Sequence, residues 1–173
     1  MMSEFSTDRR DLLLTSLLAA AAASFGSGSA EAAGVDPSKT IITLPNAIPW
    51  QIHYGYPADV AQEAALFSDL GQPGPYFTLI RWYPGHMSAP HFYDFDRLCM
   101  VLSGTWYVAS GEDFNPAAAI PVPTGSFVRR VAKTVHYDGV ISGVAEPAVI
   151  AITGTGPTKA HRIEPDKPGW RHV

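Results

Sequence analysis

From about residue 34 onward, short apolar or alternating runs are separated by turn residues. The clearest run is YFTLIRWY (76–83), in which aromatic and branched residues are bounded by prolines. The segment 58–71 is compatible with either a helical turn or an edge strand, and 97–110 has the pattern of a hairpin turning at Gly104. Other short runs with strand character lie at 40–44, 50–54, 126–132, 134–140 and 148–156. About eight to ten short strands with regular turn signals predict an antiparallel sandwich or barrel.

Composition supports one small globular domain of this kind. The chain has 173 residues, a net charge of -4 and a hydrophobic fraction of 46%, which is enough for a real core. Its 15 glycines and 15 prolines favour many turns over long helices. No basic stripe is present, so we expect no nucleic-acid partner. Cys99 is the only cysteine, which excludes an internal disulfide.

The N-terminal residues have a different pattern. TDRRDLLL (7–14) is typical of a twin-arginine export signal, and the alanine-rich apolar run that follows is too short to span a bilayer comfortably. Ala30 and Ala32 form an A-x-A site, which predicts cleavage after Ala32. We therefore expect residues 1–33 to be a signal peptide and cleavage region outside a single domain at 34–173. The mature protein would be periplasmic or otherwise exported, without stable membrane insertion. The alternative is a retained amphipathic helix or an uncleaved anchor.

Two glycine–histidine spacings point to a site. In GHMSAPHFYDFDRLCMVLSG (85–104) the order is G-x5-H-x-Y-x3-R-x6-G, and in a later segment Gly125 precedes His136. The first spacing resembles the cupin motif G-x5-H-x-H-x3,4-E-x6-G, with Tyr93 at the second histidine and Arg97 at the glutamate. The second segment resembles G-x5-P-x-G-x2-H-x3-N at its glycine and histidine, but not at its Pro, Gly and Asn positions. The resemblance covers roughly residues 75 to 156.

This resemblance implies an all-β fold, the cupin-type antiparallel β-barrel, also called a double-stranded β-helix or jelly roll. It also implies a pocket lined by His91, Tyr93, Arg97 and His136. In the family these positions converge on one divalent metal ion, so His91 and His136, with Tyr93, are the predicted ligands of Fe, Mn or Zn. Because two histidines alone hold a metal weakly, the alternative is that no metal is bound.

Three residues of the first motif leave alternatives open. Tyr93 can be a metal ligand, a phenol that contacts substrate or a packing residue. Arg97 cannot bind a metal; it either faces the interior as a fixed positive charge or turns outward to pair with Asp96. Asp96 could instead replace the missing acidic ligand. We predict catalytic roles for Tyr93, Arg97 and Asp96. Arg129 and Arg130 must face opposite sides of one strand if that strand is unbroken, so one of them would face the interior.

Three functions fit these residues. The first is a metal-dependent enzyme, dioxygenase-like or isomerase-like, acting on a small organic substrate. The second is a metal-free cupin that binds a small anionic ligand through Arg97 as a sensor or binding module. The third is a structural dimer with a filled barrel. We expect a homodimer, and the reaction does not follow from the fold.

Overall fold

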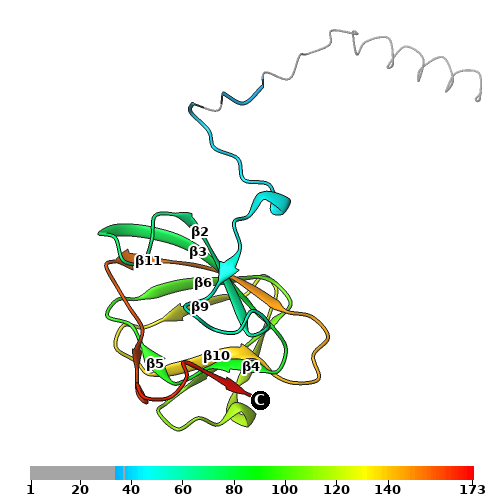
Figure 1. Cartoon of the computed structure of the whole chain (residues 1–173), viewed down its shortest axis with the longest axis vertical. Coiled ribbons are helices and arrows are strands. Elements are labelled where there is room, and N and C mark those ends of the chain that lie inside the picture. The colour runs from blue at the N-terminus through cyan, green and yellow to red at the C-terminus, as the bar shows by residue number, and fades with distance from the viewer. Residues whose placement is uncertain (1–33, 37) are drawn as a thin grey trace, which may run out of the picture. The chain divides into compact units, whose positions relative to one another are not determined.

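The structure is a computed structural model that describes residues 34–36 and 38–173 (Figure 1). The chain divides into two units, residues 1–42 and residues 43–173. The predicted signal peptide and cleavage region lies outside the described residues. Within the described part, regular structure consists of strands and two short 3-10 turns, Pro45–Ala47 and Pro116–Ala118. In that same part, no helix is long and apolar enough to cross a membrane.

One antiparallel sheet has six strands in the order β1-β2-β3-β11-β6-β9 (Figure 1). Its strands are β1 (Gln51–Ile52), β2 (Ala61–Phe67), β3 (Gly74–Trp82), β11 (Ala148–Gly156), β6 (Arg97–Ser103) and β9 (Phe127–Arg130). The long β3 and β11 pair along their whole length, from Ala148 opposite Trp82 to Gly156 opposite Gly74. These two long strands therefore form the centre of the sheet.

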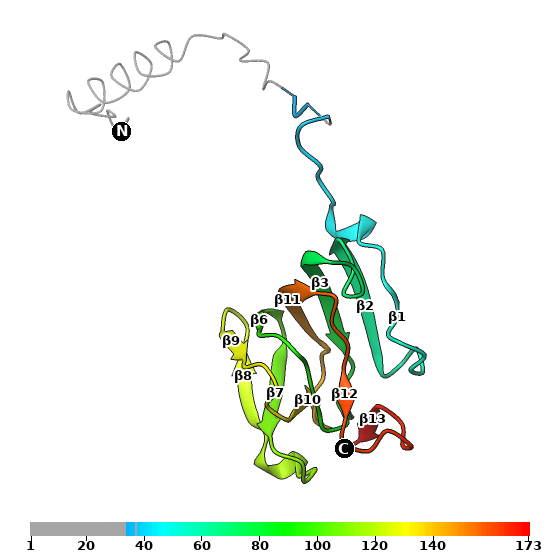
Figure 2. The same ribbon diagram turned by 90° about the vertical axis from the view of Figure 1, so that its left-hand side faces the viewer.

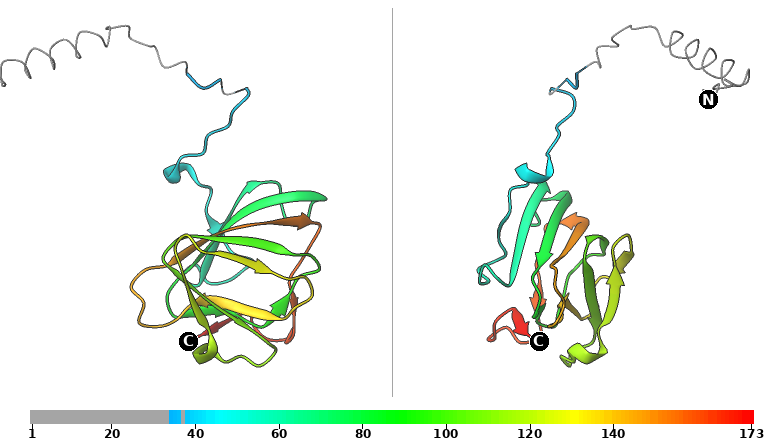
Figure 3. Two further views of the ribbon diagram at one scale, coloured as in Figure 1. Left: turned by 180° about the vertical axis from the view of Figure 1, so that it is seen from behind. Right: turned by 90° about the vertical axis from the view of Figure 1, so that its right-hand side faces the viewer.

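The second sheet has seven strands, with β10 at its centre (Figure 2). Along one path the order is β12 (His161–Arg162), β5 (His91–Phe92), β10 (His136–Val140), β4 (His86–Ser88) and β13 (Trp170–His172). β10 also pairs with β7 (Thr105–Ser110), which in turn pairs with β8 (Ile120–Pro123). Views from two further sides show this sheet facing the first (Figure 3). This is the all-β jelly roll that the sequence predicted.

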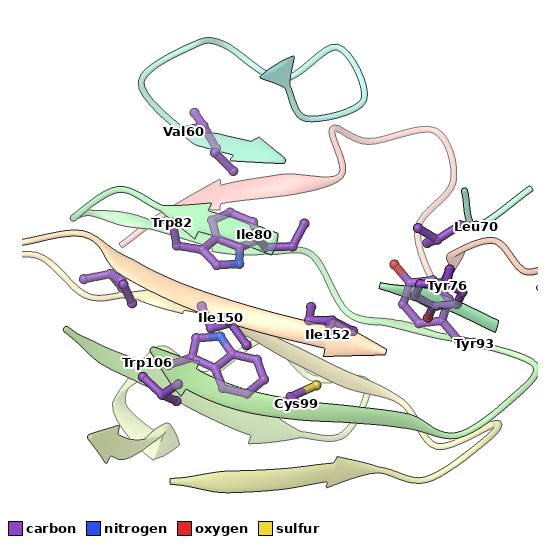
Figure 4. Packing of buried hydrophobic residues seen from close by; sticks show 14 residues of the cluster. Val60, Leu70, Tyr76, Ile80, Trp82, Tyr93, Cys99, Trp106, Ile150 and Ile152 are labelled. Atoms are coloured by element: carbon purple, nitrogen blue, oxygen red, sulfur yellow. The ribbon is translucent and has the colours of Figure 1, made fainter. Parts of the chain in front are cut away.

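Side-chain alternation places the core between the sheets. In β6, Cys99 and Val101 are buried, whereas Met100 and Leu102 between and beyond them are exposed. The largest cluster of buried residues draws on both sheets (Figure 4). Its labelled members are Val60, Leu70, Tyr76, Ile80, Trp82, Tyr93, Cys99, Trp106, Ile150 and Ile152. The interior is therefore largely aromatic and branched aliphatic.

The predicted hairpin at 97–110 is wrong. β6 pairs with β9 and β11, whereas β7 pairs with β8 and β10, so the chain crosses from one sheet to the other at Gly104. Gly104 has a φ of 71°, and a Cβ there would lie 2.4 Å from the carbonyl oxygen of Pro147. The ambiguous segment 58–71 contains strand β2, and the predicted strand at 40–44 is irregular.

Candidate functional site

A pocket of about 710 Å³ lies inside the barrel. Four predicted site residues line it: His91, Tyr93, Arg97 and His136. Because β5 and β10 belong to one sheet and β6 to the other, both sheets contribute to this group. The two motifs thus meet in one cavity, as the resemblance to the cupin motifs implied.

His91 and His136 lie directly opposite each other on β5 and β10, with ring centroids 4.6 Å apart. Each ring is held by a backbone carbonyl: His91 Nδ1 is 2.8 Å from the Ala89 oxygen, and His136 Nδ1 is 2.9 Å from the Thr134 oxygen. A carbonyl oxygen only accepts hydrogen bonds, so each Nδ1 donates. The second ring nitrogen, Nε2, is then a lone-pair acceptor in the neutral ring.

Both rings are neutral at pH 7. Burial lowers the pKa of His91 to about 4. Burial, with smaller contributions from His91 and Arg130, lowers the pKa of His136 to about 3. Neither Nε2 has a hydrogen-bond partner among the described side chains and backbone groups. The pocket therefore contains two closely spaced, unprotonated nitrogens that lack donors.

Tyr93 follows β5 and packs beside both imidazoles, with ring centroids 5.3 Å from His91 and 6.3 Å from His136. The guanidinium carbon of Arg97 lies 4.0 Å from the centroid of the same ring, which is a cation–π contact. Burial raises the pKa of Tyr93, and the positive charge of Arg97 only partly offsets this. The phenol therefore keeps its proton and serves as a hydrogen-bond donor.

Arg97 faces the interior, which decides between its two predicted orientations. It is 7% exposed, and its register partner across the strands is Arg130, which is 8% exposed. Arg130 pairs with Asp138 at 3.0 Å, and Trp106 Nε1 donates to the same carboxylate at 3.1 Å. Among residues 34–36 and 38–173, by contrast, no carboxylate lies within 4.0 Å of the Arg97 guanidinium, and its buried Nε has no partner.

Asp96 does not belong to this group. Its carboxylate accepts hydrogen bonds from Arg129 Nε at 2.7 Å and from the backbone N–H of Ala132 at 2.8 Å, on the outside of the barrel. It does not line the pocket, so the structure gives no support for its predicted catalytic role. The neighbouring arginines behave as alternation predicts, with Arg129 outward and Arg130 inward.

Sequence reasoning missed Asp138. It lies two residues after His136 on the same strand, and both residues line the pocket. Because side chains alternate between the two faces of a strand, this spacing could have indicated that Asp138 faces the same side as His136. Positive neighbours hold the pKa of its buried carboxyl below the ordinary value against the effect of burial itself. Cys99 also faces the pocket, and burial raises the pKa of its thiol to about 11. The thiol is therefore protonated and a poor nucleophile.

The donor set does not make a complete site for a resident divalent metal. The described residues hold no group of three or more His, Cys, Asp and Glu that could bind one ion. His91 and His136 supply two nitrogens, but the phenol of Tyr93 is protonated and Arg97 adds a repelling charge. Metal binding by His91, His136 and Tyr93 therefore stays a prediction.

Comparison with known proteins supports the fold. No protein-family model matches the chain, and no curated protein matches it in sequence. Among solved structures, the polyketide cyclase RemF from Streptomyces resistomycificus is similar with a TM-score of 0.60 and 13% identity, over 72% of this chain and 85% of that one. An RmlC-like cupin protein from Ralstonia eutropha JMP134 is similar with a TM-score of 0.57 and 16% identity, over 77% of this chain and 79% of that one.

The DMSP lyase DddQ from Ruegeria pomeroyi DSS-3 is a third such structure, with a TM-score of 0.55 and 13% identity, over 71% of this chain and 64% of that one. The chain therefore has the cupin fold, as the two motifs predicted. Identities this low establish the fold alone, so ligand and reaction must be argued from the pocket itself.

The buried histidines predict a pH-dependent stability. Below pH 6.5 the unfolded chain protonates both rings, whereas in the folded chain His91 stays neutral down to about pH 4 and His136 to about pH 3. The unfolded state then binds more protons than the folded state. The free energy of unfolding therefore decreases as the pH is lowered, by about 1.4 kcal/mol per pH unit for each histidine. Urea unfolding between about pH 7 and pH 5 measures the slope. His136→Gln should make it shallower, and an unchanged slope would contradict the prediction.

The altered motif predicts how metal affinity can be raised. Tyr93→His supplies an imidazole beside His91 and His136 that needs no deprotonation, so Zn²⁺ or Mn²⁺ should bind about tenfold tighter. Adding Arg97→Glu replaces repulsion with attraction and should give about tenfold more. Calorimetric titration of the wild type and both variants measures this. Uptake by the double variant alone would identify a lost metal site. No gain in the double variant would mean that the two histidines do not share an ion.

Proposed function

We propose that the barrel of this chain binds a small organic anion, whose negative group pairs with Arg97. The observation that carries the proposal is a buried guanidinium that lines the pocket and has no carboxylate within 4.0 Å among the described residues. A charge taken out of water without a partner is strongly unfavourable. A bound carboxylate would remove this cost, and arginine binds it through two parallel hydrogen bonds.

Among the described residues, three acidic residues line the pocket, Glu63, Asp69 and Asp138, and each already has a partner. Asp69 accepts a hydrogen bond from the backbone N–H of Gly71 at 2.6 Å. Asp138 accepts hydrogen bonds from Arg130 and Trp106, and Glu63 lies 2.8 Å from His53 Nδ1. Arg97 also faces Arg130 directly across the two strands, and like charges in such cross-strand pairs repel. The polar end of the pocket therefore carries an excess positive charge, which favours an anion that enters from solvent.

The rest of the pocket suits an organic body. Trp82, Trp106, Ile150 and Ile152 line it (Figure 4), and its volume of about 710 Å³ is in the usual range for small-molecule sites. A barrel filled by its own side chains would leave no such space, which argues against a purely structural role. The expected ligand thus has a carboxylate or similar group at one end and an apolar or aromatic portion.

A metal-dependent enzyme is the second candidate. The observation in its favour is the pair of imidazoles, each oriented by a carbonyl at Nδ1 so that Nε2 is free. A ligand or water would have to complete the coordination, since the protein offers too few donors. The metal titration described above separates this candidate from metal-free anion binding.

Phenylacetate tests the anion proposal. The wild type should bind it in calorimetry with chelator present, and Arg97→Met should weaken binding by at least about tenfold because the buried ion pair is lost. Arg97→Lys keeps the charge but not the two-pronged geometry, so it should bind with intermediate affinity. Arg129→Met removes a neighbouring arginine outside the barrel and should change nothing. Equal binding by wild type and Arg97→Met would refute the role of Arg97.

We also propose that the protein is exported and cleaved. The support is the arginine pair and apolar run of residues 7–14 and beyond, followed by the A-x-A site at Ala30 and Ala32. Expression with the complete N-terminus in a bacterium that has twin-arginine transport should give a periplasmic product starting near Ala33 in mass spectrometry. Replacing Arg9 and Arg10 by lysine should leave it in the cytoplasm. Intact Met1 on soluble cytoplasmic wild-type protein would contradict the proposal.

A further inference from the structure

The polar end of the pocket has a definite donor and acceptor inventory. Arg97 and the protonated phenol of Tyr93 only donate to an anion, whereas the Nε2 atoms of His91 and His136 only accept. All four side chains are buried, and neither Nε2 has a donor among the described groups. A carboxylate on Arg97 satisfies the donors but leaves both acceptors unpaired.

Both Nε2 atoms belong to residues that line the pocket, so a ligand that fills it takes water away from them. An acceptor left unpaired in this way is costly, so the two imidazoles call for a donor on the ligand. Arg130 and Trp106 both donate to Asp138, and the Tyr93 phenol and Arg97 are the donors that a bound carboxylate would occupy. The donor can therefore be supplied by the ligand, as a hydroxyl or an ammonium group, or the lone pairs can be satisfied by a cation.

The local charge discriminates between a hydroxyl and an ammonium. Two arginines, Arg97 and Arg130, face each other here, and within the described residues Asp138 is the one carboxylate within 4.0 Å of either. Asp138 attracts a positive charge placed at the His91 ring whereas the arginines repel it, and the three groups together keep an excess of one positive charge. Burial opposes an added cation as well. A neutral hydroxyl donates to the imidazoles without this penalty.

The groups are close enough for one small molecule. The guanidinium carbon of Arg97 lies 4.0 Å from the centroid of the Tyr93 ring. The centroid of the His91 ring lies 5.3 Å from that of Tyr93 and 4.6 Å from that of His136. The anion on Arg97 and the donor on the imidazoles therefore lie within a few bonds of each other in the ligand.

We infer that the ligand is a hydroxy carboxylate, with its carboxylate on Arg97 and a nearby hydroxyl donating to Nε2 of His91 or His136. The inference rests on the proposed function and specifies the substrate class for that site. His91 and His136 are then the specificity-determining residues, because they select an acid that carries a hydroxyl over one that does not.

Four molecules with one skeleton test this: mandelate, phenylacetate, phenylglycine and mandelamide. Titration calorimetry with wild-type protein and EDTA should give mandelate about tenfold tighter binding than phenylacetate, which lacks the hydroxyl. Phenylglycine, with an ammonium in place of the hydroxyl, should bind more weakly than mandelate. Mandelamide, which keeps the hydroxyl but lacks the negative charge, should not bind measurably.

A variant locates the preference in the protein. His136→Leu removes one acceptor, so the ratio of mandelate to phenylacetate affinity should fall to about two or less while phenylacetate still binds. His136→Gln restores an amide oxygen as acceptor and should recover part of the ratio. Near-ultraviolet circular dichroism checks that each variant is folded. If His136→Leu does not fold, His91→Leu, which removes the other acceptor, and the wild-type series carry the test.

The outcomes separate the two proposals. Equal affinities for mandelate and phenylacetate, or tightest binding of phenylglycine, would overturn the hydroxyl inference and leave Arg97 as an anion site. Mandelate binding that appears only when EDTA is replaced by Zn²⁺ or Mn²⁺ would also overturn it, since the imidazoles would then hold a metal. Equal binding of mandelamide and mandelate, or no binding of any of the three acids, would overturn the proposed function itself.

Discussion

Two arginines face each other inside this barrel, and the chemistry of the pocket depends on how differently they are compensated. Arg130 has Asp138 at 3.0 Å, whereas Arg97, within the described residues, has no carboxylate within 4.0 Å and packs against the face of the Tyr93 ring. A cross-strand pair of like charges is unfavourable, and burial makes it more so. The fold tolerates this arrangement because the surrounding aromatic and branched residues of both sheets supply enough buried apolar surface.

Burial is the main reason that the two histidines stay neutral. His91 and His136 would ordinarily titrate near pH 6.5, but burial and nearby cations keep them neutral at pH 7. Backbone carbonyls then fix which nitrogen carries the proton. Arg97, which only donates, thus shares the pocket with two imidazoles whose Nε2 atoms only accept, so the polar end of the pocket has a defined pattern of donors and acceptors.

Much of this was predictable from sequence. Alternation and turn spacing predicted the all-β class, and the resemblance of the two glycine–histidine spacings to the cupin motifs implied that His91 and His136 lie together, as they do. The hairpin at Gly104 was wrong because a local pattern does not say which sheet a strand joins. The direction of Arg97 could not be predicted, since the irregular step between Tyr93 and β6 breaks the alternation on which face assignment depends.

The two departures from the cupin motif are coupled by charge. In the motif, a carboxylate and imidazoles surround a metal ion, and the ion is the positive centre that an anionic ligand meets. Here the carboxylate position holds Arg97, which cannot bind a metal but is itself a permanent positive centre beside the imidazoles. Tyr93 then fills a ligand position with a ring that packs against the guanidinium and a phenol that stays protonated. If the pocket binds an anion as proposed, this one exchange supplies the positive centre without a metal ion, because a guanidinium needs no coordinating ligands.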